Sequence, residues 1–192
     1  SIPEKKYAQA LNSLLPDDIR ISESRQVPED FSSRYSATKR TYRYFIIPSH
    51  KALASQKPYV WDIAQNPDIN ILNKMVSCLK GEIDCAAFAA SGDASLSTFR
   101  YLEDAHFFYQ DIFPQTRSLV FEITANAFLW KMVRSIVGSL IYFEKSGKDE
   151  TYFKHVLESR DRSKAGPTAP PQGLFLWNVS FDGIRHDGKS RS

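Results

Sequence analysis

The chain has 192 residues, of which 42% are hydrophobic, a composition typical of a folded globular protein of one domain or slightly more. The formal net charge is only +3, so overall charge does not indicate a nucleic-acid partner, and only local clusters of basic side chains can make that case. No apolar stretch approaches the roughly 18 residues of a membrane span, and the two cysteines, Cys78 and Cys85, form no zinc pattern. We therefore expect a soluble, cytoplasmic protein with two reduced thiols and no membrane contact.

The first half of the chain alternates helical and strand patterns. The predicted elements are a helix over Tyr7–Leu15, a short strand over Ile19–Ser22, a stronger strand over Thr41–Ile47 and a helix from the Asn66-Pro67-Asp68 cap to about Leu79. The cap residue and Gly81, which follows the second helix, are typical helix start and stop signals.

The second half contains two long strands, two helices and a last strand. The predicted order is strand Ser97–Tyr109, a connection through Phe113-Pro114-Gln115, strand Ser118–Ala125, helix Asn126–Gly138, helix Thr151–Glu158, loop Ala165–Gly173 and strand Leu174–Phe181. We expect the two long strands to pair antiparallel. The whole pattern predicts an α+β fold, an antiparallel or mixed sheet flanked by helices, over residues 1–182, followed by a polar tail over 183–192.

The segment SATKRTYRY, which leads into the stronger strand, is rich in basic and aromatic side chains. On a strand, alternate side chains share a face, so Arg40 and Tyr42 lie on one face and Arg43 on the other. Such a face can bind a phosphate while the ring stacks on a base. An ordinary half-buried strand with basic side chains reaching solvent explains the same pattern, and the pattern alone favours it.

The segment NAFLWKMVRSIVG, residues 126–138, places apolar side chains around more than half of a helix. Arg134 falls at the edge of the apolar arc and needs a partner, which can be a structural carboxylate, a catalytic carboxylate or a phosphate. The pattern alone favours a structural carboxylate. Gly138 costs about 1 kcal/mol in a helix relative to alanine, so we expect another backbone or a ligand to pack closely there.

The segment DRSKAGPTAPPQGL, residues 161–174, is basic and stiffened by prolines. It can line a binding groove with little loss of entropy, although a plain connector is the commoner explanation. The chain contains no G-x-S-x-G, P-loop, G-x-G-x-x-G or H-E-x-x-H motif. The residues alone therefore predict an α+β domain that binds RNA or another substrate, and no further.

Together, three segments resemble the tRNA pseudouridine synthase A family. FSSRYSATKRTYRYFI resembles the family segment that runs into R-x-Y-x-Y, NAFLWKMVRSIVG resembles N-A-F-x-x-x-M-V-R-x-I-V-G, and DRSKAGPTAPPQGLFL resembles D-R-x-x-A-x-x-T-A-x-x-x-G-L-x-L. The matches follow the family order and cover nearly the whole chain. The resemblance implies a pseudouridine synthase-like fold that isomerises uridine in the anticodon arm of tRNA, without a cofactor or metal.

The resemblance also implies roles for individual residues. A flipped uridine would pack on Tyr42 and against Leu174, and Arg134 would pair with a catalytic aspartate. Possible phosphate contacts are Arg40, Arg43, Lys131 and Lys164.

The family nucleophile belongs to an R-T-D-A-G motif, which this sequence lacks. Ser91-Gly92-Asp93-Ala94 is the nearest match, but it lacks the Arg-Thr pair and stands in the wrong order. We therefore expect a C-terminal portion of the enzyme that has no turnover alone and belongs to a homodimer in its complete form. The alternative is a noncatalytic RNA-binding module on the same fold.

Overall fold

The computed structural model describes residues 2–113 and 116–186, and the chain divides into two units, Ser1–Ser36 and Ala37–Ser192. The first unit begins with a single 3₁₀ turn and helix α1, Tyr7–Asn12. The strand expected at Ile19–Ser22 is not formed. Instead, the Asn12 side-chain amide forms hydrogen bonds with both backbone polar groups of Ile21. It donates to the carbonyl at 2.8 Å and accepts from the N–H at 2.8 Å. A side chain thus replaces the strand partner.

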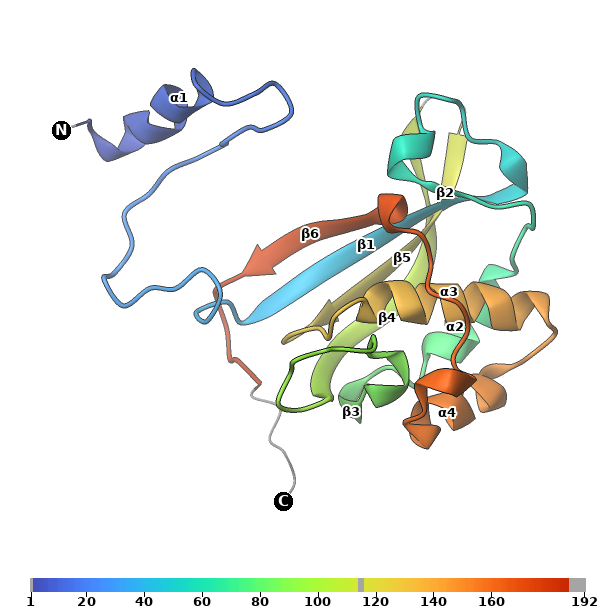
Figure 1. The fold of residues 1–192 in the computed structure, drawn as a ribbon. Coiled ribbons are helices and arrows are strands. Elements are labelled where there is room, and N and C mark those ends of the chain that lie inside the picture. The colour runs from blue at the N-terminus through green and yellow to red at the C-terminus, as the bar shows by residue number, and fades with distance from the viewer. Residues whose placement is uncertain (1, 114–115, 187–192) are drawn as a thin grey trace. The chain divides into compact units, whose positions relative to one another are not determined.

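The second unit is built on a six-stranded sheet, which confirms the α+β prediction (Figure 1). The strands are β1 Lys39–Ile47, β2 Trp61–Asp62, β3 Gly81–Asp84, β4 Phe99–Phe113, β5 Thr116–Ala125 and β6 Leu174–Ser180. Their order is β2-β1-β5-β4-β3, and β6 also pairs with β1. Among the strand pairs of the described residues, β1–β2 alone is parallel, so the sheet is mixed, and β4 and β5 form the expected antiparallel pair.

Three helices cover one face of this sheet, as Figure 1 shows: α2 Ile69–Val76, α3 Met132–Lys145 and α4 Glu150–Ser159. The expected cap is confirmed, because the Asp68 side chain accepts a hydrogen bond from the N–H of Asn70 at 2.8 Å. The main core forms between helices and sheet, with fully buried side chains such as Met75, Ile136 and Phe121.

The helix expected from Asn126 begins only at Met132. Lys131 has a left-handed backbone with φ of 59°, which a continuous helix excludes. The Asn126 side chain accepts hydrogen bonds from the N–H groups of Tyr101 and Ala127, at 3.0 and 2.7 Å, and so fixes a turn instead. Residues 126–131 therefore connect β5 to α3 as a hydrogen-bonded turn, with Trp130 54% exposed.

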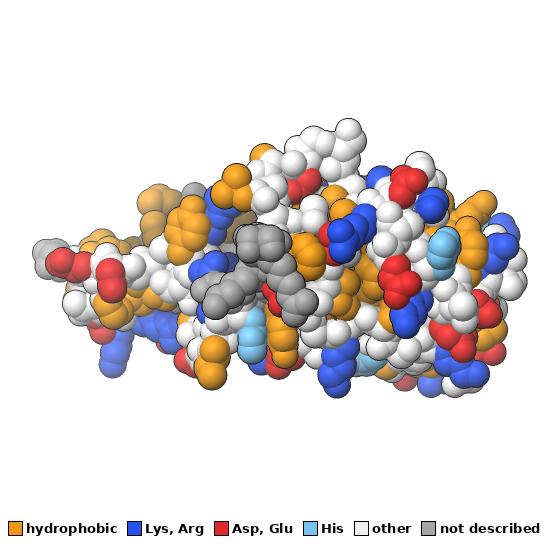
Figure 2. Space-filling view, turned by 90° about the horizontal axis from the view of Figure 1, so that it is seen from below, with side chains coloured by type: hydrophobic (Ala, Val, Ile, Leu, Met, Phe, Trp, Pro, Cys, Tyr) orange, Lys and Arg blue, Asp and Glu red, His pale blue; other side chains and the backbone are white. Residues whose placement is uncertain are grey.

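The opposite sheet face carries a smaller cluster around Phe45, Ile47, Val60 and Val120. On the face seen in Figure 2, acidic and basic side chains are interspersed and form no patch of one sign. Among the described residues, no helix is long and apolar enough to cross a membrane, and no group of His, Cys, Asp or Glu is arranged to hold a metal ion.

Both cysteines are free thiols, as expected. Burial raises the pKa of Cys85 to about 12 and that of Cys78 to about 11. The expected connection at Pro114 and Gln115 and the last six residues of the expected tail, 187–192, lie outside the described residues.

Candidate functional site

The register of β1 and β6 brings two of the expected site residues to one sheet face. Leu174 lies directly opposite Tyr44, and Leu176 lies opposite Tyr42. Directly opposed residues project from the same face, and here it is the face that the helices cover, since Tyr42, Tyr44 and Leu174 all pack against the main core. The half-buried Tyr42 ring meets the Phe128 ring edge-on, with centroids 5.0 Å apart.

The loop before β6 crosses α3 where the helix has no side chain. A Cβ built on Gly138 would lie 1.9 Å from the carbonyl oxygen of Pro167 and 2.7 Å from the nitrogen of Ala169. Nearby, the N–H of Gly166 donates to the hydroxyl of Ser139 at 2.9 Å. The close packing expected at Gly138 is therefore confirmed, and its partner is another backbone.

Arg134 is held by the same loop through two hydrogen bonds to one residue. Its Nε donates to the carbonyl oxygen of Ala169 at 2.7 Å, and its own carbonyl accepts from the Ala169 N–H at 3.0 Å. Within residues 2–113 and 116–186, no carboxylate forms an ion pair with it. The structural aspartate that the helix pattern favoured is thus not found there. The Nε contact fixes the plane of the guanidinium group, with its charge at the edge of the core.

Tyr44 is the central residue that the sequence analysis missed. It is fully buried, and its hydroxyl donates to the carbonyl oxygen of Pro170 at 2.6 Å. Burial raises the pKa of Tyr44 above its ordinary value, and the nearby charge of Arg134 partly opposes that shift. A Cβ on Gly173 would come within 2.8 Å of the Tyr44 ring. Tyr44 thus joins β1, the loop, Arg134 and Leu174, and its only sequence signal was the second Tyr of R-x-Y-x-Y.

Two of the four expected phosphate contacts adjoin the turn before α3. Arg40 donates from Nη1 to the carbonyl oxygens of Asn126 and Ala37, at 2.7 and 3.2 Å. Lys131 is exposed, and its ammonium lies 4.2 Å from the centre of the Trp130 ring. Both basic groups therefore lie at residues 126–131, the turn before α3, which also contains Phe128, the ring that contacts Tyr42.

Lys164 is an exposed residue of the 3₁₀ turn Arg162–Lys164 at the start of the loop. Asp161 caps this turn, and its hydrogen bonds to Ser163 lower the pKa of its carboxyl group. Arg162, which was not singled out from the sequence, donates to Gly166 and Thr168 at 3.2 and 3.0 Å and ties the loop to itself.

Arg43 lies on the opposite sheet face, as the strand alternation predicted, and is not brought together with Tyr42. Its Nε bonds Glu122 at 2.5 Å, and its guanidinium lies between the rings of Trp177 and Phe108, 4.1 and 5.3 Å from their centres. Only 19% of its side chain is exposed. These contacts make it a structural link between β1, β5 and β6.

Asp93, the acid of the Ser91-Gly92-Asp93-Ala94 match, has a local role. Its carboxylate accepts hydrogen bonds from the N–H groups of Trp130 and of Ser95, and bonding to Ser95 lowers its pKa. It therefore anchors the turn before α3 to the 90–95 loop. The site as a whole offers a half-buried ring, an aliphatic side chain and an oriented guanidinium, a set suited to a planar ring and an anion.

Comparison with known proteins gives a consistent result. A family model described as tRNA pseudouridine synthase matches residues 75–182. The tRNA pseudouridine synthase A of Treponema denticola is 49% identical over 181 residues, which are 94% of this chain and 66% of that protein. The protein of the same name from Treponema pallidum is 46% identical over 84% of this chain and 56% of its own length. That from Thermoanaerobacter pseudethanolicus is 40% identical over 94% and 72%. The chain thus spans less than two thirds of the treponemal relatives.

Proposed function

Because the chain belongs to the tRNA pseudouridine synthase family, we propose that it carries the C-terminal part of an active site that isomerises uridine to pseudouridine in the anticodon arm of tRNA. The observation that supports this proposal best is the arrangement around Tyr44. There the β1–β6 register and the Arg134–Ala169 hydrogen bond join the three segments that resemble the family.

In the proposed mechanism, the target uridine is flipped out of the RNA stack, since chemistry on a stacked base requires it. The base packs on Tyr42 and against Leu174, which lie on one face of neighbouring strands. The terminal nitrogens of Arg134 pair with the nucleophilic aspartate, which keeps the carboxylate ionised and oriented. The aspartate attacks the substrate, and the base is detached, turned and rejoined through carbon.

The positions of the four basic residues support the proposed phosphate contacts unequally. Lys131 and Lys164 are exposed, and Arg40 adjoins the turn that holds Lys131, so these three side chains suit contacts with a phosphate backbone. Arg43 supports this role less well, because its guanidinium is bound to Glu122 on the other sheet face. We propose it as a structural residue first.

The 192 residues contain no R-T-D-A-G motif, so we propose that they make no pseudouridine by themselves. The experiments below use a longer protein, in which a family N-terminal segment that bears this motif is joined before Ser1. We call this protein the completed enzyme. The proposal includes a cytoplasmic homodimer that acts on tRNA without a cofactor or metal.

The alternative is a noncatalytic RNA-binding module on the same fold. The genomic reading frame upstream of Ser1 separates the two. An R-T-D-A-G segment there supports the enzyme, whereas a native start codon at or near Ser1 supports the module.

The proposed site is tested by mapping pseudouridine in an unmodified tRNA transcript after incubation with the completed enzyme. We expect modification confined to the anticodon arm, and modification only elsewhere would contradict the assignment. Tyr42→Phe is the matched variant, since it keeps the ring contact with Phe128 and removes the hydroxyl. If the hydroxyl serves in proton removal, the variant forms pseudouridine about 100-fold more slowly or worse, while its affinity for tRNA stays within about twofold of the wild type. An equally active variant would limit Tyr42 to stacking.

A further inference from the structure

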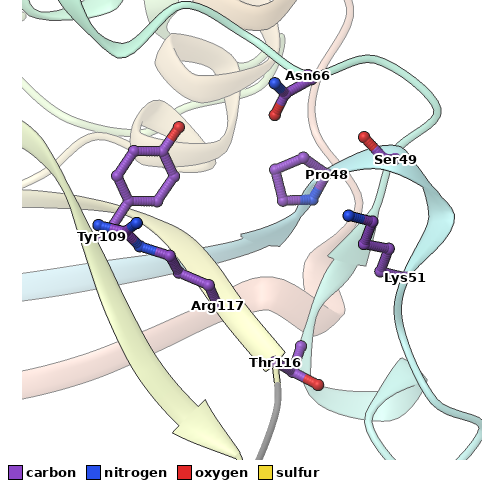
Figure 3. Close-up of a pocket in the computed structure, with 7 residues that line it drawn as sticks. All are labelled: Pro48, Ser49, Lys51, Asn66, Tyr109, Thr116 and Arg117. Carbon is purple, nitrogen blue, oxygen red and sulfur yellow. The ribbon is translucent and has the colours of Figure 1, made fainter.

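A polar pocket lies at the far end of β1 from Tyr42, and the proposed mechanism does not use it. It has a volume of about 360 Å³ and lies between the segment after β1, Tyr109 of β4 and the start of β5 (Figure 3). The side chains that line it include two cations, Lys51 and Arg117, and the polar groups of Ser49 and Asn66. Among the described residues that line it, none is an aspartate or a glutamate.

The two cations are not neutralised by an ion pair within the described part of the chain. Arg117 lies over the Tyr109 ring, 4.3 Å from its centre, and both side chains line the pocket from neighbouring strands. In Figure 3 the amine of Lys51 points toward the space between Pro48 and Arg117. A concave site with two positive charges and no carboxylate in its lining favours an anion.

His50 and Lys57, unlike the two cations of the pocket, have a carboxylate partner. His50 and Lys57 both approach the carboxylate of Asp62, at 3.5 and 3.9 Å. That carboxylate is thus shared by His50 and Lys57, and neither Lys51 nor Arg117 forms an ion pair with it. Lys51 and Arg117 therefore line the pocket without an ion pair to any described residue, and the carboxylate opposite Arg117, Asp111, is not among the lining residues.

The backbone at the rim of the pocket is strained. Ser49 and His50 are consecutive residues with φ of 61° and 52°, a left-handed conformation that is unfavourable for non-glycine residues. Hydrogen bonds hold it, since the N–H of Ser49 donates to Gln65 and that of His50 to Ile63, at 3.1 and 2.8 Å. Strain that the surroundings maintain is concentrated at binding sites in proteins, and here it turns the chain so that Ser49 and Lys51 line one pocket.

The pocket and the candidate site lie on the same side of the sheet. Tyr109 packs against the helix-covered core, as Tyr42 does, and Arg117 lies over its ring. Pro48 stands six positions after Tyr42, which corresponds to roughly 20 Å along the strand at the usual rise. An RNA arm that delivers a base to Tyr42 can therefore place its backbone near the pocket.

We propose that this pocket binds a backbone phosphate of the tRNA outside the flipped nucleotide, with Lys51 and Arg117 as the charged contacts. The inference rests on the proposed function and extends it with a second point of attachment. Two such points about 20 Å apart fix the angle of the RNA arm on the sheet. The contact is to phosphate, so it adds affinity and orientation without reading sequence.

The test measures binding of a tRNA transcript to the 192-residue chain between about 50 and 200 mM salt, with the double variant Lys51→Gln/Arg117→Gln. We expect affinity to fall roughly 10- to 100-fold at the lower salt. The slope of log K against log salt should become shallower by about 2, since each lost phosphate contact removes about 1. Lys57→Gln is the matched control, because its cation belongs to the Asp62 pair, and it should leave the slope unchanged.

Asp111→Asn gives a change of the opposite sign. Asp111 is the cross-strand partner of Arg117, and its removal should strengthen binding by about threefold. A double variant with wild-type affinity and slope would overturn the pocket assignment and leave the proposed function intact. A wild-type chain that does not bind tRNA would count against both the proposed function and the pocket.

A free phosphate or nucleotide is the other source of the same chemistry. Inorganic phosphate and UMP are therefore titrated against the wild-type chain and the double variant. The proposal expects neither to bind as tightly as tRNA. If phosphate or UMP binding is lost in the double variant while tRNA binding is retained, the pocket is a small-anion site and the RNA assignment is wrong.

Discussion

Gly138→Ala should destabilise the protein, although alanine is the better helix former by about 1 kcal/mol. The added methyl group would lie 1.9 Å from the Pro167 oxygen and 2.7 Å from the Ala169 nitrogen, and both are backbone atoms. Either the loop or α3 must move, so we expect a loss of about 3 kcal/mol or more in unfolding free energy. For a chain of this size that is roughly 6–12 °C in melting temperature, measured by thermal and urea unfolding.

Lys145→Ala is the matched control for this change. It places alanine at an exposed position in the last turn of the same helix, one turn beyond Tyr142, and should alter stability by less than about 0.5 kcal/mol. If Gly138→Ala raised the melting temperature as helix propensity alone predicts, the packing of the loop against α3 would be wrong. The position of the loop segment that holds Arg134 would then be wrong as well, since Ala169 contacts both Gly138 and Arg134.

Replacing Arg134 should cause the largest loss of activity in the completed enzyme. Arg134→Lys keeps the charge but loses the planar group that binds Ala169 through Nε and that, in the proposed mechanism, presents its terminal nitrogens to the nucleophilic carboxylate. We expect the turnover number to fall about 100- to 1000-fold, a loss typical of breaking a buried, oriented charge pair, with tRNA affinity little changed. Single-turnover kinetics and tRNA binding on the same preparation separate the two effects.

The pH profile provides a second readout for Arg134. A nearby positive charge lowers the pKa of a carboxyl group, so the wild-type aspartate stays ionised to lower pH. Arg134→Gln removes that charge, raises the carboxyl pKa and should shift the acidic limb of the rate profile to higher pH. Arg160→Gln removes the ion pair between the residue that follows α4 and Asp84 at the end of β3, and it should leave the limb in place. An unchanged limb in Arg134→Gln would mean that Arg134 does not contact the nucleophile.

Local patterns were sufficient to predict the parts of the fold that depend on neighbouring residues. Alternation predicted β1 and β5, and placed Tyr42 and Arg43 on opposite faces, because the period of a strand is independent of its partners. The Asp68 cap is equally local. β2 and β3 span two and four residues, too few to show a period, and were not predicted.

Long-range contacts explain where the sequence interpretation was wrong. The apolar run 126–131 has helical periodicity, but the Asn126 side chain and the left-handed Lys131 make it a turn. Gly138 indicated that something packs closely against the helix, but not which residues do so. Those residues, Pro167 and Ala169, lie about thirty positions further along the chain. Tyr44 was overlooked because its importance comes from Arg134, Pro170 and Gly173, which meet only in the folded chain.

The most direct test of the account compares tritium release from tRNA labelled at C5 of uridine, since that hydrogen is lost when the base is rejoined through carbon. The two proteins compared are the 192-residue chain and the completed enzyme, at equal concentration and with tRNA binding measured for both. We predict release by the completed enzyme and none above background by the chain alone, because Arg134, Tyr42 and Leu174 then lack their aspartate. Pseudouridine formed by the 192 residues alone would contradict this account.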